Sequence, residues 1–178
     1  MGFSSDKVTE TLVNIVPKIW NLVKKFYSDK QIKLESELGT IYKDYLEYSC
    51  KKYSTVKTLL YKNEGKFLYN FYEPQFLESE SGELIDTSNS NMIFQKNHKI
   101  IVTGTGGIGK SMLMKHIFIN QVNNASSIPI FIELKSINAI QLDDFDFETF
   151  IFQEIERHHL NIPIDYFKET LKTGEYTI

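Results

Sequence analysis

KIIVTGTGGIGKSMLMKHIF, residues 99–118, is the most strongly patterned stretch of this 178-residue sequence. It opens with Ile100, Ile101 and Val102, a β-branched apolar run that predicts a buried strand. Residues 104–111, GTGGIGKS, match the pattern G-x-x-x-x-G-K-S/T at every fixed position. Residues 112–118 are mostly good helix formers with apolar spacing, so a helix is expected next. Strand, glycine-rich loop and helix in this order predict a phosphate-binding loop.

The loop contains the residue types that phosphate binding requires. Glycines lack the Cβ atoms that would keep successive backbone N–H groups away from phosphate oxygens, and a helix N-terminus favours an anion. Lys110 supplies a mobile ammonium group for the β- and γ-phosphates, and the Ser111 hydroxyl is a candidate ligand for Mg²⁺. The predicted residues for binding the phosphates of ATP or GTP are Gly104, Thr105, Gly106, Gly107, Ile108, Gly109, Lys110, Ser111 and Met112.

The sequence after this loop predicts further parts of an α/β fold. Residues 128–134, IPIFIEL, predict a second buried strand, which would lie parallel to the first across the intervening helix. Helices are expected at about 146–160 and 162–171, and residues 176–178 resemble the start of a third strand. The predicted fold class is therefore α/β, as part of a three-layer P-loop sandwich with parallel strands that an N-terminal α-helical region precedes.

Residues 1–77 are expected to form this helical region. Apolar residues recur at helical spacing over 5–29 and again over 32–62, with a predicted break near Ser54. Residues 67–74 are rich in aromatic side chains and end at a proline, which favours an extended conformation. The N-terminal helices are candidates for binding protein partners or a second copy of the chain.

A polar segment divides the two halves. Residues 78–97 are rich in Ser, Glu and Asn and predict a linker or mobile loop. Residues 98–178 would then be the N-terminal part of a nucleotide-binding domain. The expected third strand, which would hold the metal-binding acid, begins only at Tyr176, so the sequence is interpreted as the N-terminal part of a longer protein.

Composition restricts the kind of protein. The net charge is −3 and Arg157 is the only arginine, which does not favour a nucleic-acid binder, and we expect no nucleic-acid contact by this segment. Cys50 is the only cysteine, so no internal disulfide can form, as is usual in a reducing compartment. No run of 18 apolar residues is present, so no membrane partner is expected, and the predicted location is cytoplasmic.

A phosphate-loop hydrolase also needs a carboxylate at the end of a neighbouring strand. Glu133 and the pair Asp143 and Asp144 follow short apolar runs and imitate this signal. The catalytic residues thus stay unassigned, and Ser111 is the one metal ligand predicted. No histidine pairs with Cys50 at a metal-binding spacing, and His158 and His159 are interpreted as surface residues.

Residues 99–178 resemble the NACHT domain of the signal-transducing STAND class of P-loop NTPases. The resemblance rests on IIVTGTGGIGKSMLMKHIF, on IPIFIELKSI about twenty residues later, and on FKETLKTGEYTI. It implies a nucleotide-dependent signalling switch within a multidomain protein, related to bacterial defence and NLR-like proteins and acting in antiviral or stress defence. It also implies ATP hydrolysis in the full-length protein, with ATP (or GTP) and Mg²⁺ as cofactors.

Two other functions compete with a signalling switch. One is a kinase or other phosphotransferase of small molecules on the same loop, although such enzymes usually line their lid with several arginines. The other is a non-catalytic protein-interaction module. Because the expected metal-binding acid is missing, the 178-residue chain alone is expected to hydrolyse ATP negligibly. Because the sheet would also lack its third strand and expose an edge, the nucleotide-binding half is expected to be marginally stable.

Overall fold

The computed structural model describes residues 32–57, 65–94, 98–124, 127–139, 145–172, 174 and 176–178. For residues 32–39 and 139 only the backbone is described. The helix predicted over 5–29 lies outside the described residues. The described chain combines helices with three small two-stranded sheets, which agrees with the predicted α/β class.

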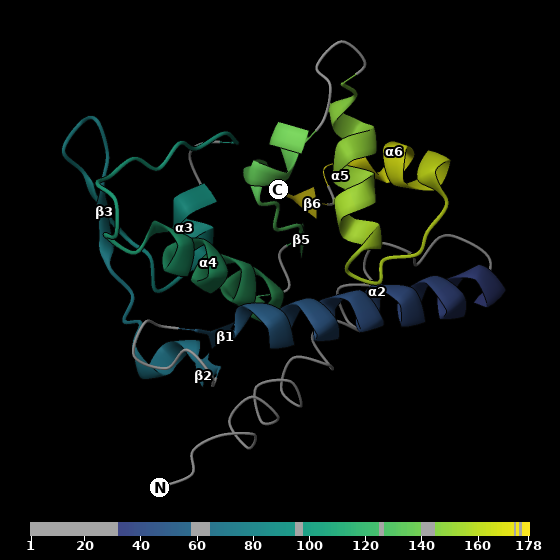
Figure 1. The fold of residues 1–178 in the computed structure, drawn as a ribbon, viewed down its shortest axis with the longest axis horizontal. Coiled ribbons are helices and arrows are strands. Elements are labelled where there is room, and N and C mark those ends of the chain that lie inside the picture. Colours follow the sequence, from purple (N-terminus) through teal and green to yellow (C-terminus); the bar gives the residue numbers. More distant parts are fainter. Residues whose placement is uncertain are drawn as a thin grey trace, which may run out of the picture.

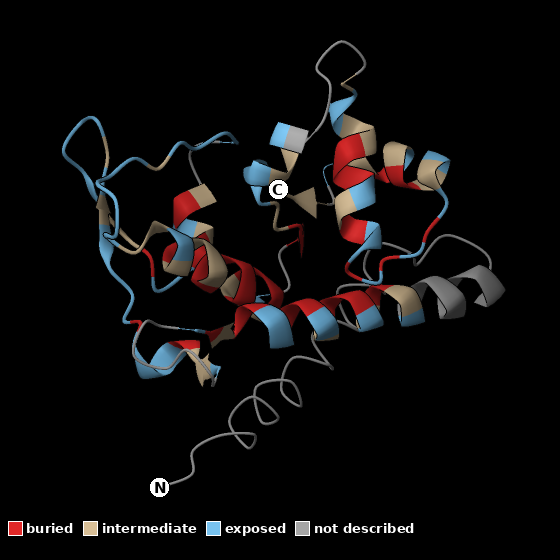
Figure 2. Cartoon of the chain, in the orientation of Figure 1, coloured by how far each residue is buried: buried red, intermediate tan, exposed pale blue. Residues whose placement is uncertain are grey.

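The longest element is helix α2 (Ile32–Tyr53), which runs along the base of the molecule in Figure 1. Its apolar and small side chains recur every three or four residues, as the sequence predicts, and those that are buried are Tyr42, Tyr45, Leu46, Ser49, Cys50 and Tyr53. Figure 2 shows these buried positions along one side of α2 and exposed positions along the other. The helix is therefore amphipathic and packs on its neighbours.

Helix α2 ends where a break was predicted. The Ser54 N–H donates to the Cys50 carbonyl at 2.8 Å, and strand β1 (Thr55–Val56) follows. β1 pairs antiparallel with strand β2 (Lys66–Phe67). The expectation that helix continues past Ser54 is therefore wrong for residues 55–57, which are not helical, because Thr55 and Val56 pair with β2 instead.

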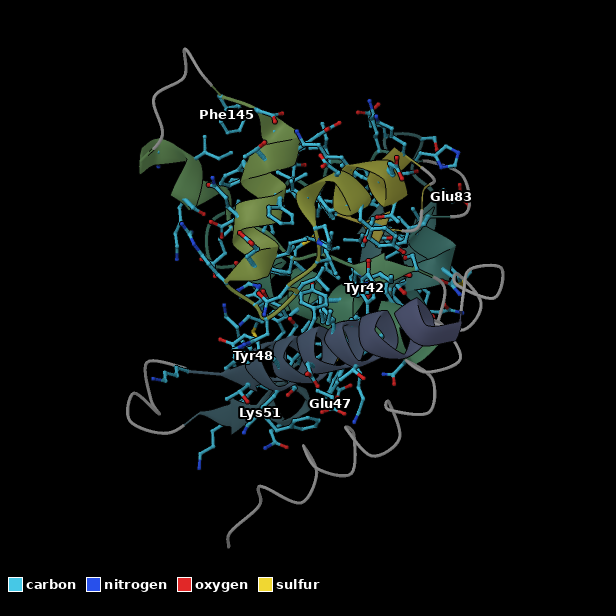
Figure 3. All side chains as sticks on the ribbon, turned by 90° about the vertical axis from the view of Figure 1, so that its right-hand side faces the viewer. Tyr42, Glu47, Tyr48, Lys51, Glu83 and Phe145 are labelled. Atoms are coloured by element: carbon cyan, nitrogen blue, oxygen red, sulfur yellow. The ribbon has the colours of Figure 1, made fainter. Side chains whose placement is uncertain are left out.

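Two hydroxyl groups connect α2 to a parallel pair of strands. The pair consists of β5 (Ile128–Pro129) and β6 (Tyr176–Thr177), in register Ile128 to Tyr176. The Tyr45 hydroxyl donates to the Pro129 carbonyl at 2.8 Å, and the Tyr42 hydroxyl lies 2.5 Å from that of Tyr176. In Figure 3, Tyr42 lies on the face of α2 toward the interior and Glu47 on the opposite face.

The predicted strands are confirmed in part. Residues 128 and 129 form a strand, and the Ile130 N–H extends the ladder to the Thr177 carbonyl at 2.7 Å. Leu134 already belongs to a short 3₁₀ helix, η2 (Leu134–Ala139). The start of a strand at Tyr176 is confirmed, and its partner is β5.

The buried strand predicted at Ile100–Val102 is not formed. These residues have no ladder partner in the described part of the chain, and the Ile101 side chain is 91% exposed. The all-apolar pattern predicted a strand with apolar cover on both faces. In the structure, β5 pairs with β6 rather than with this segment. We call residues 98–103, which lead into the glycine-rich loop, the approach segment.

The segment predicted as a linker contains regular structure. After the 3₁₀ helix η1 (Leu68–Asn70), strands β3 (Phe76–Glu78) and β4 (Leu84–Asp86) form an antiparallel hairpin. Helix α3 (Ser90–Phe94) follows and packs on α4 (Lys110–Asn124). The described part of 78–97 is thus attached to the helix after the loop, whereas the proposed domain boundary stays a prediction.

Two more helices complete the fold on the other side of β5 and β6 in the view of Figure 1. Helix α5 (Phe147–Glu156) begins at Asp146, whose carboxylate accepts the Glu148 N–H at 3.2 Å as an N-cap. Helix α6 (Ile164–Lys172) follows and precedes Gly174, which has a φ of +76°. None of the helices described here is long and apolar enough to cross a membrane.

Candidate phosphate-binding site

The glycine-rich loop is an exposed turn in front of helix α4. Gly107 and Gly109 have φ values of +80° and +102°, a region that residues with a Cβ rarely adopt. Residues 104–108 are exposed, and apart from the glycine and its two chain neighbours no described atom lies within 4 Å of where a Cβ at Gly106, Gly107 or Gly109 would stand. The backbone of these glycines is therefore open to a ligand.

The loop passes directly into the first turn of α4. The Gly109 carbonyl accepts the N–H groups of both Met112 and Leu113 at 2.9 Å, which starts the helix. The first N–H groups of an α-helix have no acceptor within the helix and carry the positive end of its dipole. Since α4 spans 15 residues, this end can attract an anion at the loop.

Lys110 folds back over the loop. Its Nζ donates to the Gly104 carbonyl at 2.6 Å and to the Thr105 carbonyl at 2.9 Å. The ammonium group thus lies above the first two loop residues, where it is half-buried rather than extended into solvent. This position brings the predicted phosphate-binding cation to the glycines that were predicted to act with it.

The other predicted residues lie on the same loop and turn. Ser111 is exposed and Met112 is half-buried on the first turn of α4. A serine hydroxyl at this place, beside an open glycine backbone and an ammonium group, is chemically suited to an Mg²⁺ ion that carries phosphate oxygens. Ser111 therefore fits the predicted metal-ligand role, and the fit rests on its place at the helix start.

Of the candidate acids, the structure describes Glu133 alone, and this carboxylate has a partner of its own. The exposed Glu133 carboxylate pairs with the Lys135 ammonium, which lowers the pKa of Glu133 through that hydrogen bond. Asp143 and Asp144 lie outside the described residues. Among the residues described, no three His, Cys, Asp or Glu side chains gather as a metal site.

A network that sequence reasoning missed lies farther along α4. The buried His116 ring accepts or donates at both nitrogens, with Nε2 2.7 Å from the Thr87 carbonyl and Nδ1 2.9 Å from the Tyr69 hydroxyl. Since the carbonyl can only accept, Nε2 carries the proton and Nδ1 accepts from Tyr69. Burial lowers the pKa of His116, so the neutral ring is favoured.

One and two turns later on α4, two asparagines continue this network. Asn120 Oδ1 accepts both the N–H and the hydroxyl of the buried Ser90 at 2.8 Å, and its Nδ2 donates to the Ser88 carbonyl at 2.9 Å. Asn124 Nδ2 donates to Asn89 Oδ1 at 3.2 Å. We call residues 87–94, which α4 holds in this way, the docked segment. The signal in the sequence was a polar residue at every fourth position, His116, Asn120 and Asn124.

His158 corrects another expectation from the sequence. It is buried rather than exposed, with Nε2 2.7 Å from Lys52 Nζ and Nδ1 3.4 Å from the Tyr53 hydroxyl. Desolvation by burial, followed by the nearby Lys52 charge, lowers its pKa to about 4. His159 is exposed as predicted, and its ring packs edge-on against Tyr48.

An apolar cavity of about 960 Å³ lies beside the approach segment. Its lining includes Ile100 and Val102 of that segment, residues of α4 and α5, and the strand β6. The polar side chains at its wall include Gln121 and Glu148. Both this volume and a largely apolar wall are typical of small-molecule pockets.

Comparison with family models, with curated proteins and with solved structures finds no match for this chain. The assignment of the site therefore depends on its residues and their geometry.

Proposed function

We propose that this chain is a nucleotide-binding P-loop protein that binds ATP or GTP together with Mg²⁺. The observation that carries the proposal is the exposed glycine loop with Lys110 Nζ 2.6 Å and 2.9 Å from its first two carbonyls. Phosphate oxygens would replace these carbonyls as acceptors of the ammonium group, while the open glycine N–H groups would donate to the same phosphates. The proposed ligand set is residues 104–112, with Ser111 as the Mg²⁺ ligand.

The proposed architecture is the partial three-layer P-loop sandwich with parallel strands. The parallel pair β5 and β6 and the helices α4 and α5 support it. The division into domains proposed from the sequence places the boundary within residues 78–97. For this division to hold, the docked segment must stay with α4 and the boundary must lie between the docked segment and the N-terminal helical region. The N-terminal helices would bind protein partners or a second copy of the chain.

In the full-length protein, the proposed role is a NACHT-type signalling switch with ATP hydrolysis, in antiviral or stress defence. The support is the resemblance of IIVTGTGGIGKSMLMKHIF and IPIFIELKSI to that family. The proposed cytoplasmic location is supported by the cysteine content, because Cys50 is the only cysteine and no internal disulfide can form. Arg157, which a phosphotransferase would need near phosphate, pairs with Glu154 one helical turn away.

Nucleotide titration of the 178-residue chain tests the proposal. We expect Mg-ATP or Mg-GTP to bind, and Lys110→Ala to weaken the affinity about 100-fold because it removes charge-assisted hydrogen bonds. Lys172→Ala, which removes an exposed lysine of α6, is the matched control and should leave the affinity unchanged. Equal affinities of wild type and Lys110→Ala, measured by calorimetry, would contradict the proposal.

The metal role of Ser111 has its own test. Ser111→Ala should weaken binding in the presence of Mg²⁺ by about tenfold and should weaken binding in EDTA much less. The Lys110→Ala variant should lose affinity under both conditions, because its contact is with phosphate rather than with metal. Equal losses for Ser111→Ala with and without Mg²⁺ would exclude the proposed ligand.

A further inference from the structure

The hairpin of β3 and β4 has one covered face and one open face. Residues directly opposite each other in an antiparallel pair point to the same face, so the register Leu77 to Ile85 puts these two side chains together. Both are half-buried and pack against the hydrophobic core. Phe76 and Leu84 lie on the other face, where each residue is 65% exposed. Figure 2 shows the hairpin at the left margin of the molecule with most of its residues exposed.

The outer edge of β3 carries backbone groups that point away from β4. The Thr87 N–H donates to the Gln75 carbonyl at 3.2 Å, so residues 75 and 87 form a hydrogen-bonded pair of the ladder. Such pairs alternate with pairs whose N–H and carbonyl groups point outward, which are here the groups of Phe76 and Glu78. None of the described residues bonds to these groups. An exposed edge of this kind is a template for a further strand.

The charged side chains around this edge are all negative. Between Lys66 and Lys96 the sequence contains no Lys, Arg or His. The acidic residues in this interval are Glu73, Glu78, Glu80, Glu83 and Asp86. If β3 paired with β3 of a second copy of the chain, like charges would meet across the new ladder, which is destabilising. Lys or Arg side chains of a different strand would instead be attracted to these carboxylates, so the charge favours a basic partner.

From these observations we propose that the outer edge of β3 is a docking site for an extended, basic segment of a partner protein. The segment pairs with the outward N–H and carbonyl groups of Phe76 and Glu78 and adds a third strand to the hairpin. On the open face, an apolar side chain of the partner lies beside Phe76, and a Lys or Arg two residues away lies beside Glu78. This docking is independent of nucleotide binding at the glycine-rich loop.

Titration with synthetic strand peptides tests the chemistry of the partner. The probe is a fluorescently labelled peptide VTKTVTKT, which alternates an apolar and a basic side chain on one face of an extended strand. The matched probe VTETVTET has the same pattern with the opposite charge. We expect the basic peptide to bind the 178-residue chain about tenfold or more tightly than the acidic one in fluorescence anisotropy. Equal affinities of the two peptides, or no binding of the basic one, would contradict the proposal.

Two variants of one residue separate the backbone contact from the charge. Glu78→Pro removes the outward N–H and leaves the hydrogen bonds to β4 in place, a position at which an edge strand tolerates proline. It should weaken binding of VTKTVTKT about tenfold. Glu78→Gln removes only an exposed charge and should weaken binding about threefold. Glu156→Gln, which removes an exposed carboxylate of α5, is the control and should leave the affinity unchanged. Wild-type affinity of Glu78→Pro would exclude this edge.

Amide hydrogen exchange of the wild-type chain, followed residue by residue by NMR, supplies a readout that needs no variant. Saturating VTKTVTKT should slow exchange at Phe76 and Glu78 about tenfold, because their N–H groups enter a new ladder. The Leu77 N–H already points to β4 and should change much less. Binding without this alternation would overturn strand addition. A dimer in sedimentation that Glu78→Pro dissociates would show that a second copy occupies the edge, and the proposal would be wrong.

Discussion

The docked segment and the approach segment lie close together in the sequence, but they differ in the contacts that hold them. The docked segment, residues 87–94, is polar at many positions, yet His116, Asn120 and Asn124 bind its backbone and side chains. The approach segment, residues 98–103, is more apolar, yet Ile101 is exposed and no ladder forms there. Specific hydrogen bonds from one helix thus hold a polar segment in place. An apolar segment without a partner strand is not held in a sheet.

The turns of α4 also differ in the part of the molecule to which they belong. The first turn of α4 belongs to the candidate phosphate site, through Lys110 and Ser111. The later turns hold the docked segment, which ends shortly before the approach segment begins. The chain before the phosphate loop and the residues after it are therefore both attached to the same helix, and the described residues 98–103 between them have no ladder partner in the described part of the chain.

The strongest test of the comparison removes the central asparagine. Asn120→Ala leaves the N–H and hydroxyl of the buried Ser90 without their acceptor, and unmade buried hydrogen bonds cost about 1–3 kcal/mol each. We expect the free energy of unfolding in urea to fall by about 2–4 kcal/mol. Asn123→Ala in the same turn removes an amide with no hydrogen bond to another described residue and should cost under about 0.5 kcal/mol. Similar losses for both variants would show that the docked segment is not held by Asn120.

A smaller loss is expected at the other end of the network. Tyr69→Phe removes the donor to His116 Nδ1 and leaves this buried nitrogen unpaired. The expected decrease in the free energy of unfolding is about 1–2 kcal/mol. Tyr48→Phe, which changes an exposed tyrosine, is the control. If both variants had the same free energy of unfolding, packing alone would hold the docked segment in place.

Acid should weaken the docked segment because His116 must stay neutral there. Burial lowers its pKa below the usual value of 6.5, so the unfolded chain binds the proton more readily than the folded chain. Stability from this histidine is present above pH 6.5 and is lost as the pH falls below it. We expect wild type to lose about 1 kcal/mol more than His116→Gln between pH 7 and pH 5 in chemical denaturation. Parallel pH dependences of the two proteins would exclude His116 as the titrating group.

The smallest effect is expected in the approach segment. Ile101→Thr keeps the β-branched shape and removes apolar surface that is already in water. Without nucleotide, its free energy of unfolding should stay within about 0.5 kcal/mol of wild type. A loss of 2 kcal/mol or more, roughly the cost of truncating a buried side chain, would mean that both segments are equally fixed.

The parts of the fold that the sequence predicted correctly are those with a local cause. The buried stripe of α2 follows from Tyr42, Tyr45 and Tyr53 at helical spacing, and the start of α5 follows from the capping side chain of Asp146. The loop geometry likewise follows from its glycines, which alone tolerate the observed φ values at 107 and 109.

The parts that could not be predicted depend on which segments meet in space. The apolar run at Ile100–Val102 indicates burial, but it does not say that β5 pairs with Tyr176 instead. The polar composition of 78–94 suggested a linker because its partners, His116 and Asn120, lie about 30 residues later in the sequence. Which segments pair over such separations in the sequence cannot be read from any local pattern of residues.

The contact between Tyr42 and Tyr176 has a consequence for how the chain is made. These hydroxyls lie 2.5 Å apart although 134 residues separate them in the sequence. At a synthesis rate of about 5–20 residues per second, Tyr42 is made roughly 7–27 s before Tyr176. During that time α2 can pack on α4 and β5, but its contact with Tyr176 cannot form. The end of α2 around Tyr42 therefore completes its native packing only late in synthesis, after Tyr176 has been made.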